Sequence, residues 1–106
     1  MSAQAAIDVL GTAPGHALMA TELLARLVAR DLTPAAAEAA VADLEQDGRV
    51  VIGHHPPPDV HLTTLDLRTV ALVAAPGPDA IERARAAGEA RWSAFLRDFL
   101  ATHRCG

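Results

Sequence analysis

Apolar residues in the first third of the chain recur at helical spacing and are interrupted by turn residues. The pattern predicts a short helix over Ala3–Leu10, which the turn residues of Gly11–Gly15 end. It predicts a second helix over Thr21–Arg30, with Thr21 as the N-cap because its hydroxyl can accept a free backbone N–H. One face of this second helix carries four apolar residues, Leu23, Leu24, Leu27 and Val28.

A third helix, Thr33–Asp47, has sequence signals at both of its ends. Thr33 supplies a capping hydroxyl and Pro34 follows it at the first helical position. Gly48 is expected just beyond the C-terminal end, where glycine tolerates left-handed backbone angles. The residues predicted to be buried along this helix are Ala37, Ala40, Val41 and Leu44.

The segment after Gly48 predicts two strands joined by a stiff turn. The first strand is Val50–Ile52, and the returning strand is Val60–Thr64. Between them, His54–Asp59 contains three consecutive prolines, which lack the N–H that a strand ladder needs. Leu65–Val73 is compatible with a helix or a strand, and we expect a helix capped by Thr64.

The longest predicted helix, Asp79–His103, carries every aromatic residue of the chain apart from the histidines. Its apolar stripe is Ile81, Ala84, Gly88, Trp92, Phe95 and Phe99. With Leu96 and Leu100, this stripe exceeds what a lone exposed helix leaves in water. The helix either folds back onto the core or pairs with a second chain. Because burying one such aromatic is worth about 2–3 kcal/mol, we expect a dimer interface of Ile81, Trp92, Phe95, Leu96, Phe99 and Leu100.

Length and composition bound the fold and the compartment. The 106 residues predict a mainly α fold with a small β component (α+β), divided into a domain over 1–74 and a C-terminal helix over 79–106. No apolar run is long enough to span a membrane. The N-terminus lacks a basic signal-peptide region, and the single Cys105 cannot form an internal disulfide. A cytoplasmic protein is therefore expected.

The order of helix, helix, turn, helix and hairpin over residues 3–65 resembles a winged helix-turn-helix domain. Val41–Val51 resembles the end of a third helix running into a wing, and His61–Thr63 resembles the strand that leaves the wing. The long helix that follows is similar to that of small bacterial MarR and PadR transcription regulators. The resemblance implies a two-stranded wing, a homodimer and binding of double-stranded DNA, with Thr33–Asp47 as the recognition helix.

The charges of this region argue against the DNA contact that the resemblance implies. The candidate DNA-binding residues are Arg26, Arg30, Thr33, Ala35, Ala36, Arg49, His54 and His55, with Arg68 as a further nearby cation. The third helix has no Lys or Arg, and it carries Glu38, Asp43, Glu45 and Asp47. DNA affinity comes largely from neutralised phosphates. The leading function is still a small homodimeric DNA-binding transcription regulator, and the alternative is a winged-helix protein–protein interaction module without DNA affinity.

No residue pattern predicts an enzyme, a metal site or a cofactor. His54, His55 and His61, even with Asp59, do not make the ligand set that a closed zinc site uses. Cys105 near His103 has no third orienting group. Ser93 lies within a helix without the Gly-x-Ser-x-Gly context of a nucleophile, and no glycine-rich phosphate loop is present.

Overall fold

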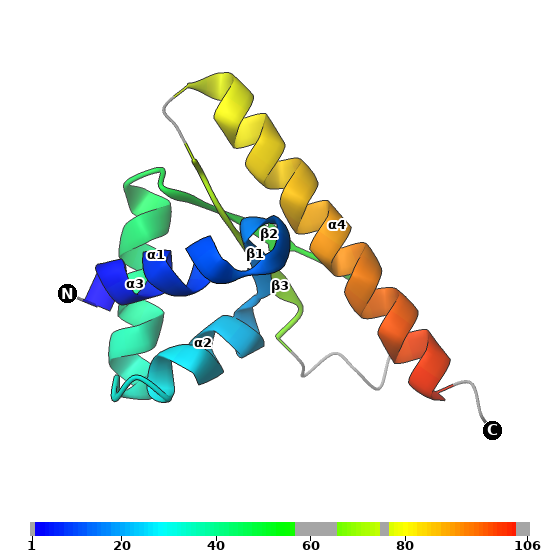
Figure 1. Cartoon of the computed structure of the whole chain (residues 1–106), viewed down its shortest axis with the longest axis horizontal. Coiled ribbons are helices and arrows are strands. Elements are labelled where there is room, and N and C mark those ends of the chain that lie inside the picture. The colour runs from blue at the N-terminus through cyan, green and yellow to red at the C-terminus, as the bar shows by residue number, and fades with distance from the viewer. Residues whose placement is uncertain (1, 57–65, 75–76, 104–106) are drawn as a thin grey trace.

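The computed structural model describes residues 2–56, 66–74 and 77–103. In chain order the elements are α1 (Ser2–Thr12), η1 (Pro14–His16), β1 (Ala17–Met19), α2 (Ala20–Val28), α3 (Pro34–Gln46), β2 (Val50–His54), β3 (Arg68–Leu72) and α4 (Pro78–His103). The fold is mainly helical with one small antiparallel sheet. Figure 1 shows α1, α2 and α3 gathered on one side of this sheet and α4 crossing the other side. No described helix is long and apolar enough to cross a membrane.

The sheet has three strands in the order β1-β3-β2, one more than the two strands that the sequence predicted. Val70 of β3 lies opposite Leu18 on one side and Ile52 on the other. The helix expected over Leu65–Val73 is wrong, because Arg68–Leu72 forms this central strand. The predicted returning strand, Val60–Thr64, lies outside the described residues.

The signals at the two ends of α3 are confirmed. The Thr33 hydroxyl accepts a 3.1 Å hydrogen bond from the backbone N–H of Ala36. Beyond the other end, Gly48 has φ +73°. The N–H of Arg49 donates to the carbonyl of Leu44 at 2.9 Å, which closes the helix with a Schellman-type turn.

The second helix differs from its prediction at both ends. It begins at Ala20, so Thr21 lies inside its first turn, and its N-cap Met19 makes no side-chain capping bond. It ends at Val28. Val28 was expected on the buried face, but its side chain is 43% exposed. This leaves a large apolar side chain on the surface at the turn between α2 and α3.

The sheet separates the two sides of the hydrophobic core. The larger cluster lies among α1, α2, α3 and one sheet face, and includes Leu10, Leu23, Leu27, Leu44 and Val70. Two smaller clusters involve α4. One comprises Ala17, Ala71 and Ala84, and the other comprises Met19, Leu67 and Trp92. The part of α4 from Ala80 to Trp92 therefore completes the core of the same chain, which is the first of the two alternatives that the sequence left open.

Candidate interaction surface

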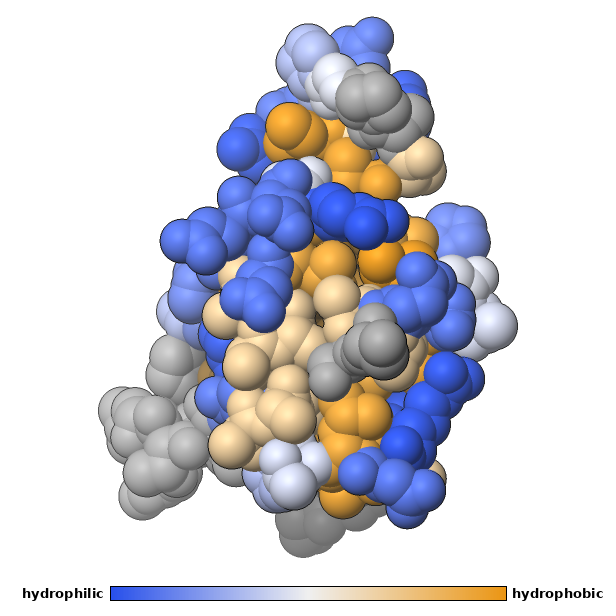
Figure 2. Space-filling view, turned by 90° about the vertical axis from the view of Figure 1, so that its left-hand side faces the viewer, coloured by the Kyte–Doolittle hydropathy of each residue, from blue (hydrophilic) through white to orange (hydrophobic). Residues whose placement is uncertain are grey.

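The surface of α3 is made of alanines and carboxylates. Ala35 and Ala39 are exposed and Ala36 is half-buried, while Glu38 and Glu45 are exposed. Figure 2 shows the side of the molecule on which α1 and α3 lie, with hydrophobic surface along its middle and hydrophilic residues on its borders. This surface can make apolar contacts and attract cations, but it offers no positive side chain to a phosphate.

A groove runs between α2 and α3. It consists of two adjoining hollows that share Leu24 and Glu38, and we call it the α2–α3 groove. The hollow at the turn between the helices is lined by Leu24, Ala25, Val28, Pro34, Ala35 and Glu38. The hollow at the sheet end is lined by Ala20, Leu24, Glu38, Val41, Ala42, Glu45, Ile52 and Arg68. The groove is thus apolar along its floor and acidic along its α3 wall.

Among the described residues, Arg68 is the one cation that lines this groove. It is bound by a carboxylate that lies just before β3, the strand that begins at Arg68. Its Nε and Nη2 donate to the two oxygens of Asp66 at 2.8 and 2.7 Å, a bidentate pair. Hydrogen bonds from Arg68 lower the pKa of Asp66, and the same bonds raise the pKa of Arg68. Glu38 lies 3.8 Å from the Arg68 guanidinium as well. The positive charge of Arg68 is therefore compensated within the chain.

Two of the predicted DNA-binding arginines, Arg26 and Arg30, form ion pairs within the chain. Arg26 lies 3.5 Å from Glu22, and Arg30 lies 4.0 Å from Asp8. Both pairs are exposed, so they contribute little to stability. Arg49 is exposed after the end of α3.

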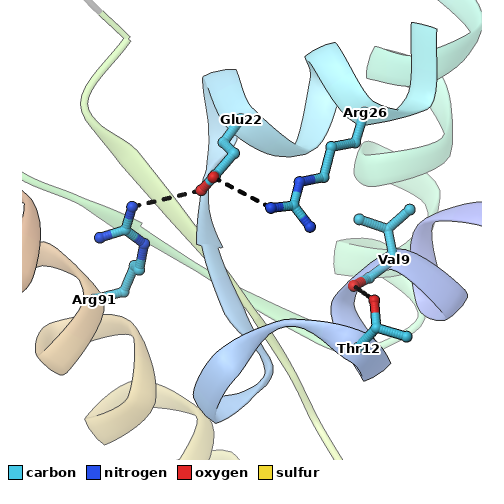
Figure 3. Close-up of polar contacts among 5 residues, drawn as sticks. All are labelled: Val9, Thr12, Glu22, Arg26 and Arg91. Atoms are coloured by element: carbon cyan, nitrogen blue, oxygen red, sulfur yellow. Dashed lines mark hydrogen bonds and ion pairs between the residues drawn. The ribbon is translucent and has the colours of Figure 1, made fainter. Parts of the chain in front are cut away.

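Glu22 connects two helices that are far apart in the sequence. Figure 3 shows its carboxylate between Arg26 of α2 and Arg91 of α4, each at 3.5 Å. The spacing of Glu22 and Arg26 within one helix was visible in the sequence, but the contact with Arg91 arises only when α4 folds back. This ion pair was missed by sequence reasoning, as was the one between Arg68 and Asp66.

His55, a predicted DNA contact, is instead part of the junction between the sheet and α4. Its ring stacks on Trp92 with centroids 4.6 Å apart, and its Nε2 lies 2.9 Å from the hydroxyl of Thr69. Thr69 is only 1% exposed. Gly88 of α4 approaches so closely that a Cβ there would lie 3.1 Å from the Thr69 hydroxyl. His54, the other predicted contact, is exposed at the end of β2.

We expect His55 to make the unfolding free energy fall as the pH decreases from about 7 to about 5. Burial lowers the pKa of His55 below 6.5, with Glu89 opposing and His54 assisting the shift. As the pH falls, the His55 ring therefore binds a proton in the unfolded chain before it does so in the folded chain. The stabilisation is lost as the pH falls below the pKa that His55 has in the unfolded chain. Asp66 does not contribute to the change in unfolding free energy between about pH 7 and 5, since its pKa lies below its usual acidic value.

Urea unfolding at several pH values would measure this dependence. In His55→Gln, the part of the pH dependence that belongs to this ring should disappear, whereas His16→Gln should leave it in place because His16 is exposed. An unchanged pH dependence in His55→Gln would show that packing at the junction does not shift the pKa of the His55 ring.

The residues predicted for a dimer interface occupy different environments. Trp92 is only 8% exposed and packs within its own chain, with Phe95 and Leu96 half-buried beside it. Ile81 and Phe99 are half-buried, and the Phe99 ring lies 6.1 Å from that of Phe95. Leu100 is 52% exposed. The distal part of α4 is therefore where an interface could form.

Metal-ligating side chains do not gather into a site in the described part of the chain. Among those residues, no group of three or more His, Cys, Asp or Glu side chains could hold a metal ion. Asp59, His61 and Cys105, which the sequence raised as candidates, lie outside the described residues.

Comparison of the chain with protein-family models, curated proteins and solved structures finds no match. Function must therefore be argued from the charge and shape of the surface.

Proposed function

We propose that the chain is a winged-helix module that binds protein through the face formed by α2 and α3, and that it does not bind DNA. The winged-helix assignment is supported by the order α1-β1-α2-α3-β2-β3 and by the short turn between α2 and α3. In such a domain α3 takes the place of the recognition helix. The surface chemistry of α3 therefore decides between a nucleic acid and a protein as its partner.

The observation that carries the proposal is the absence of any cation from α3 together with the compensated charge of Arg68. Exposed Glu38, Asp43 and Glu45 would repel phosphates, whose neutralisation supplies most nonspecific DNA affinity. Val28 and Leu24 offer apolar contact area at the same place. Apolar surface with an acidic border suits a protein partner that has apolar and basic side chains.

A homodimeric DNA-binding transcription regulator is the competing proposal. One observation favours it: Arg49 is exposed at the junction of α3 and β2, and its side chain forms no ion pair with the described residues. Arg26 and Arg30 are held only by long ion pairs. These three arginines would have to supply the phosphate contacts.

A titration with labelled genomic DNA fragments separates the two proposals. At about 50 mM salt, where phosphate attraction is strong, we expect no saturable binding to the wild-type chain at micromolar concentration. Glu38→Arg should introduce weak binding, because it replaces a repelled charge by an attracted one. In that variant each new phosphate contact should add about one unit to the log–log salt slope.

The matched control is Glu89→Arg, which makes the same charge change at an exposed position on α4. It should leave DNA binding absent. Saturable wild-type binding with a salt slope of about three, reduced by about one in Arg49→Ala, would establish the DNA-binding regulator in place of the protein-binding module.

A further inference from the structure

We propose that a cavity between α2 and α4 binds a small monocarboxylate with an apolar body, whose carboxylate is held by Arg91 and Arg26. We call it the α2–α4 cavity, and its volume of about 400 Å³ lies within the usual range for small-molecule sites. Among the described residues, none lines both this cavity and the α2–α3 groove. The proposal therefore adds a second, separate site to the protein-binding face.

The walls of the α2–α4 cavity are mostly apolar, and they form where α4 lies against η1 and β1. Gly15 of η1 has φ +66° and carries no side chain, and a Cβ there would meet no atom within 4 Å. Ala17 and Leu18 of β1 also line the cavity and are buried. A hydrocarbon chain would therefore meet apolar atoms on both sides of the cavity. The α4 side is lined by Ala87, Ala90 and Ala94.

Three charged side chains converge at this cavity. Figure 3 shows the Glu22 carboxylate between Arg26 of α2 and Arg91 of α4. Each guanidinium lies 3.5 Å from one of the two carboxylate oxygens, whereas charge-assisted hydrogen bonds are usually about 2.7–2.9 Å long. Arg91 is more enclosed than Arg26, since their side chains are 27% and 47% exposed. Two arginines and one glutamate give this group a formal net charge of +1.

The two arginines retain hydrogen-bonding capacity. A guanidinium has five N–H donors. Among the described residues, Glu22 is the one hydrogen-bond partner of each of these two guanidinium groups. By contrast, Arg68 donates to both oxygens of Asp66, at 2.8 and 2.7 Å. A ligand carboxylate can therefore accept from N–H groups that Glu22 leaves unused, in the bidentate geometry that suits a guanidinium.

The net charge selects the class of ligand. A monoanion neutralises the +1 charge of the three side chains, whereas a cation is repelled by it. A phosphate dianion would leave a negative charge uncompensated beside apolar walls, which is costly. A neutral apolar compound would displace water from the N–H donors without offering them an acceptor. An apolar monocarboxylate is the class that suits the walls and the charges together.

Octanoate is a suitable probe, because it combines one carboxylate with a flexible apolar chain. NMR titration of the isotope-labelled chain should show saturable binding with a dissociation constant of about 1 mM or lower. Octanamide has nearly the same shape without the charge. It should bind at least about tenfold more weakly, since a charge-assisted hydrogen bond is roughly twice as strong as a neutral one. The backbone signals that move with octanoate should include those of Leu18, Glu22 and Arg91.

Two substitutions change the charge of the site in opposite directions. Arg91→Gln removes the more enclosed cation and should weaken octanoate binding at least about tenfold, with little effect on octanamide. Glu22→Gln removes the competing carboxylate and should tighten octanoate binding at least about threefold. If the three side chains only fastened α4 to α2, Glu22→Gln would give no gain in affinity. Arg97→Gln is the matched control, because Arg97 is exposed on α4 and does not line the cavity.

A third substitution tests the apolar walls. Ala94→Leu would reduce the cavity volume, so octanoate and octanamide should both bind at least about threefold more weakly. Ala86→Leu is its control, since Ala86 is exposed on α4 and does not line the cavity. Circular dichroism and thermal unfolding would establish that all of these variants are folded.

Three results would each overturn the proposal. The first is an absence of saturation up to about 10 mM octanoate, where a site of about 1 mM affinity would be about nine-tenths occupied. The second is equal affinity for octanoate and octanamide. The third is an octanoate affinity that Arg91→Gln does not lower or that Glu22→Gln does not raise. The role of the α2–α3 face is tested separately by the DNA titration, so failure of either proposal leaves the other in place.

Discussion

Replacement of Trp92 by alanine is expected to destabilise the folded chain by about 3–5 kcal/mol. The indole is only 8% exposed and packs with Met19 and Leu67, where α4 closes over the sheet. It also stacks between His55 and Phe95, with ring centroids 4.6 and 5.4 Å away. Its removal would leave a cavity lined by several elements that cannot all collapse into it. Urea unfolding followed by circular dichroism would measure the loss.

Leu100→Ala is the control for this prediction, because Leu100 lies on the same helix but is 52% exposed. It should change the unfolding free energy by less than about 1 kcal/mol. Both variants should be compared at a protein concentration below that of self-association, so that only the stability of the single chain is measured. A loss below about 1 kcal/mol in Trp92→Ala would contradict the packing of α4 against its own sheet.

The parts of the fold that could be predicted from the sequence are those set by local chemistry. The start of α3 follows from the Thr33 hydroxyl and Pro34, and its end follows from Gly48. The four residues predicted to be buried on α3 are all buried. These features depend on residues within a few positions of one another, so no tertiary information is needed to find them.

The strand at Val50–Ile52 was predicted and lies within β2, but β1 and β3 were not predicted because their stability comes from distant partners. Ala17–Met19 is buried at every position, so it lacks the alternation that marks a half-exposed strand. The segment around Val70 has a composition that permits a helix, but pairing with Leu18 and Ile52 on its two sides makes it a central strand. The exposure of Val28 likewise depends on where the tertiary fold places the end of α2.

The candidate surface was predictable in composition but not in arrangement. The acidic character of α3 is evident from Glu38 and Glu45 in the sequence. The neutralisation of Arg68 depends on its geometry with Asp66, and no local sequence pattern identifies this pair. The stack joins His55, the residue after β2, to Trp92 of α4, so a residue predicted as a surface contact is a half-buried part of the junction between the sheet and α4.

A second large effect is expected from Gly53→Ala, which should destabilise the chain by about 1–3 kcal/mol. The new Cβ would lie 2.7 Å from the Thr69 hydroxyl and 2.9 Å from Nε2 of His55. Thr69 is a short side chain with 1% exposure, so it cannot move aside without disturbing β3. Displacing the His55 ring would break its hydrogen bond and leave the buried hydroxyl unpaired, which is costly in itself.

The control for Gly53→Ala is Gly11→Ala, since a Cβ at Gly11 would meet no atom within 4 Å and the residue lies in helix α1. This change should stabilise the chain by about 0.5–1 kcal/mol, because alanine loses less conformational freedom than glycine in a helix. In a Thr69→Ala background, Gly53→Ala should cost less than in the wild type, since the nearest obstructing atom has been removed. Thermal and urea unfolding of the four chains of this double-mutant cycle would give the coupling. A Gly53→Ala chain as stable as the wild type would contradict the close junction of His55, Thr69 and α4, and it would also remove the basis for the pH dependence assigned to His55.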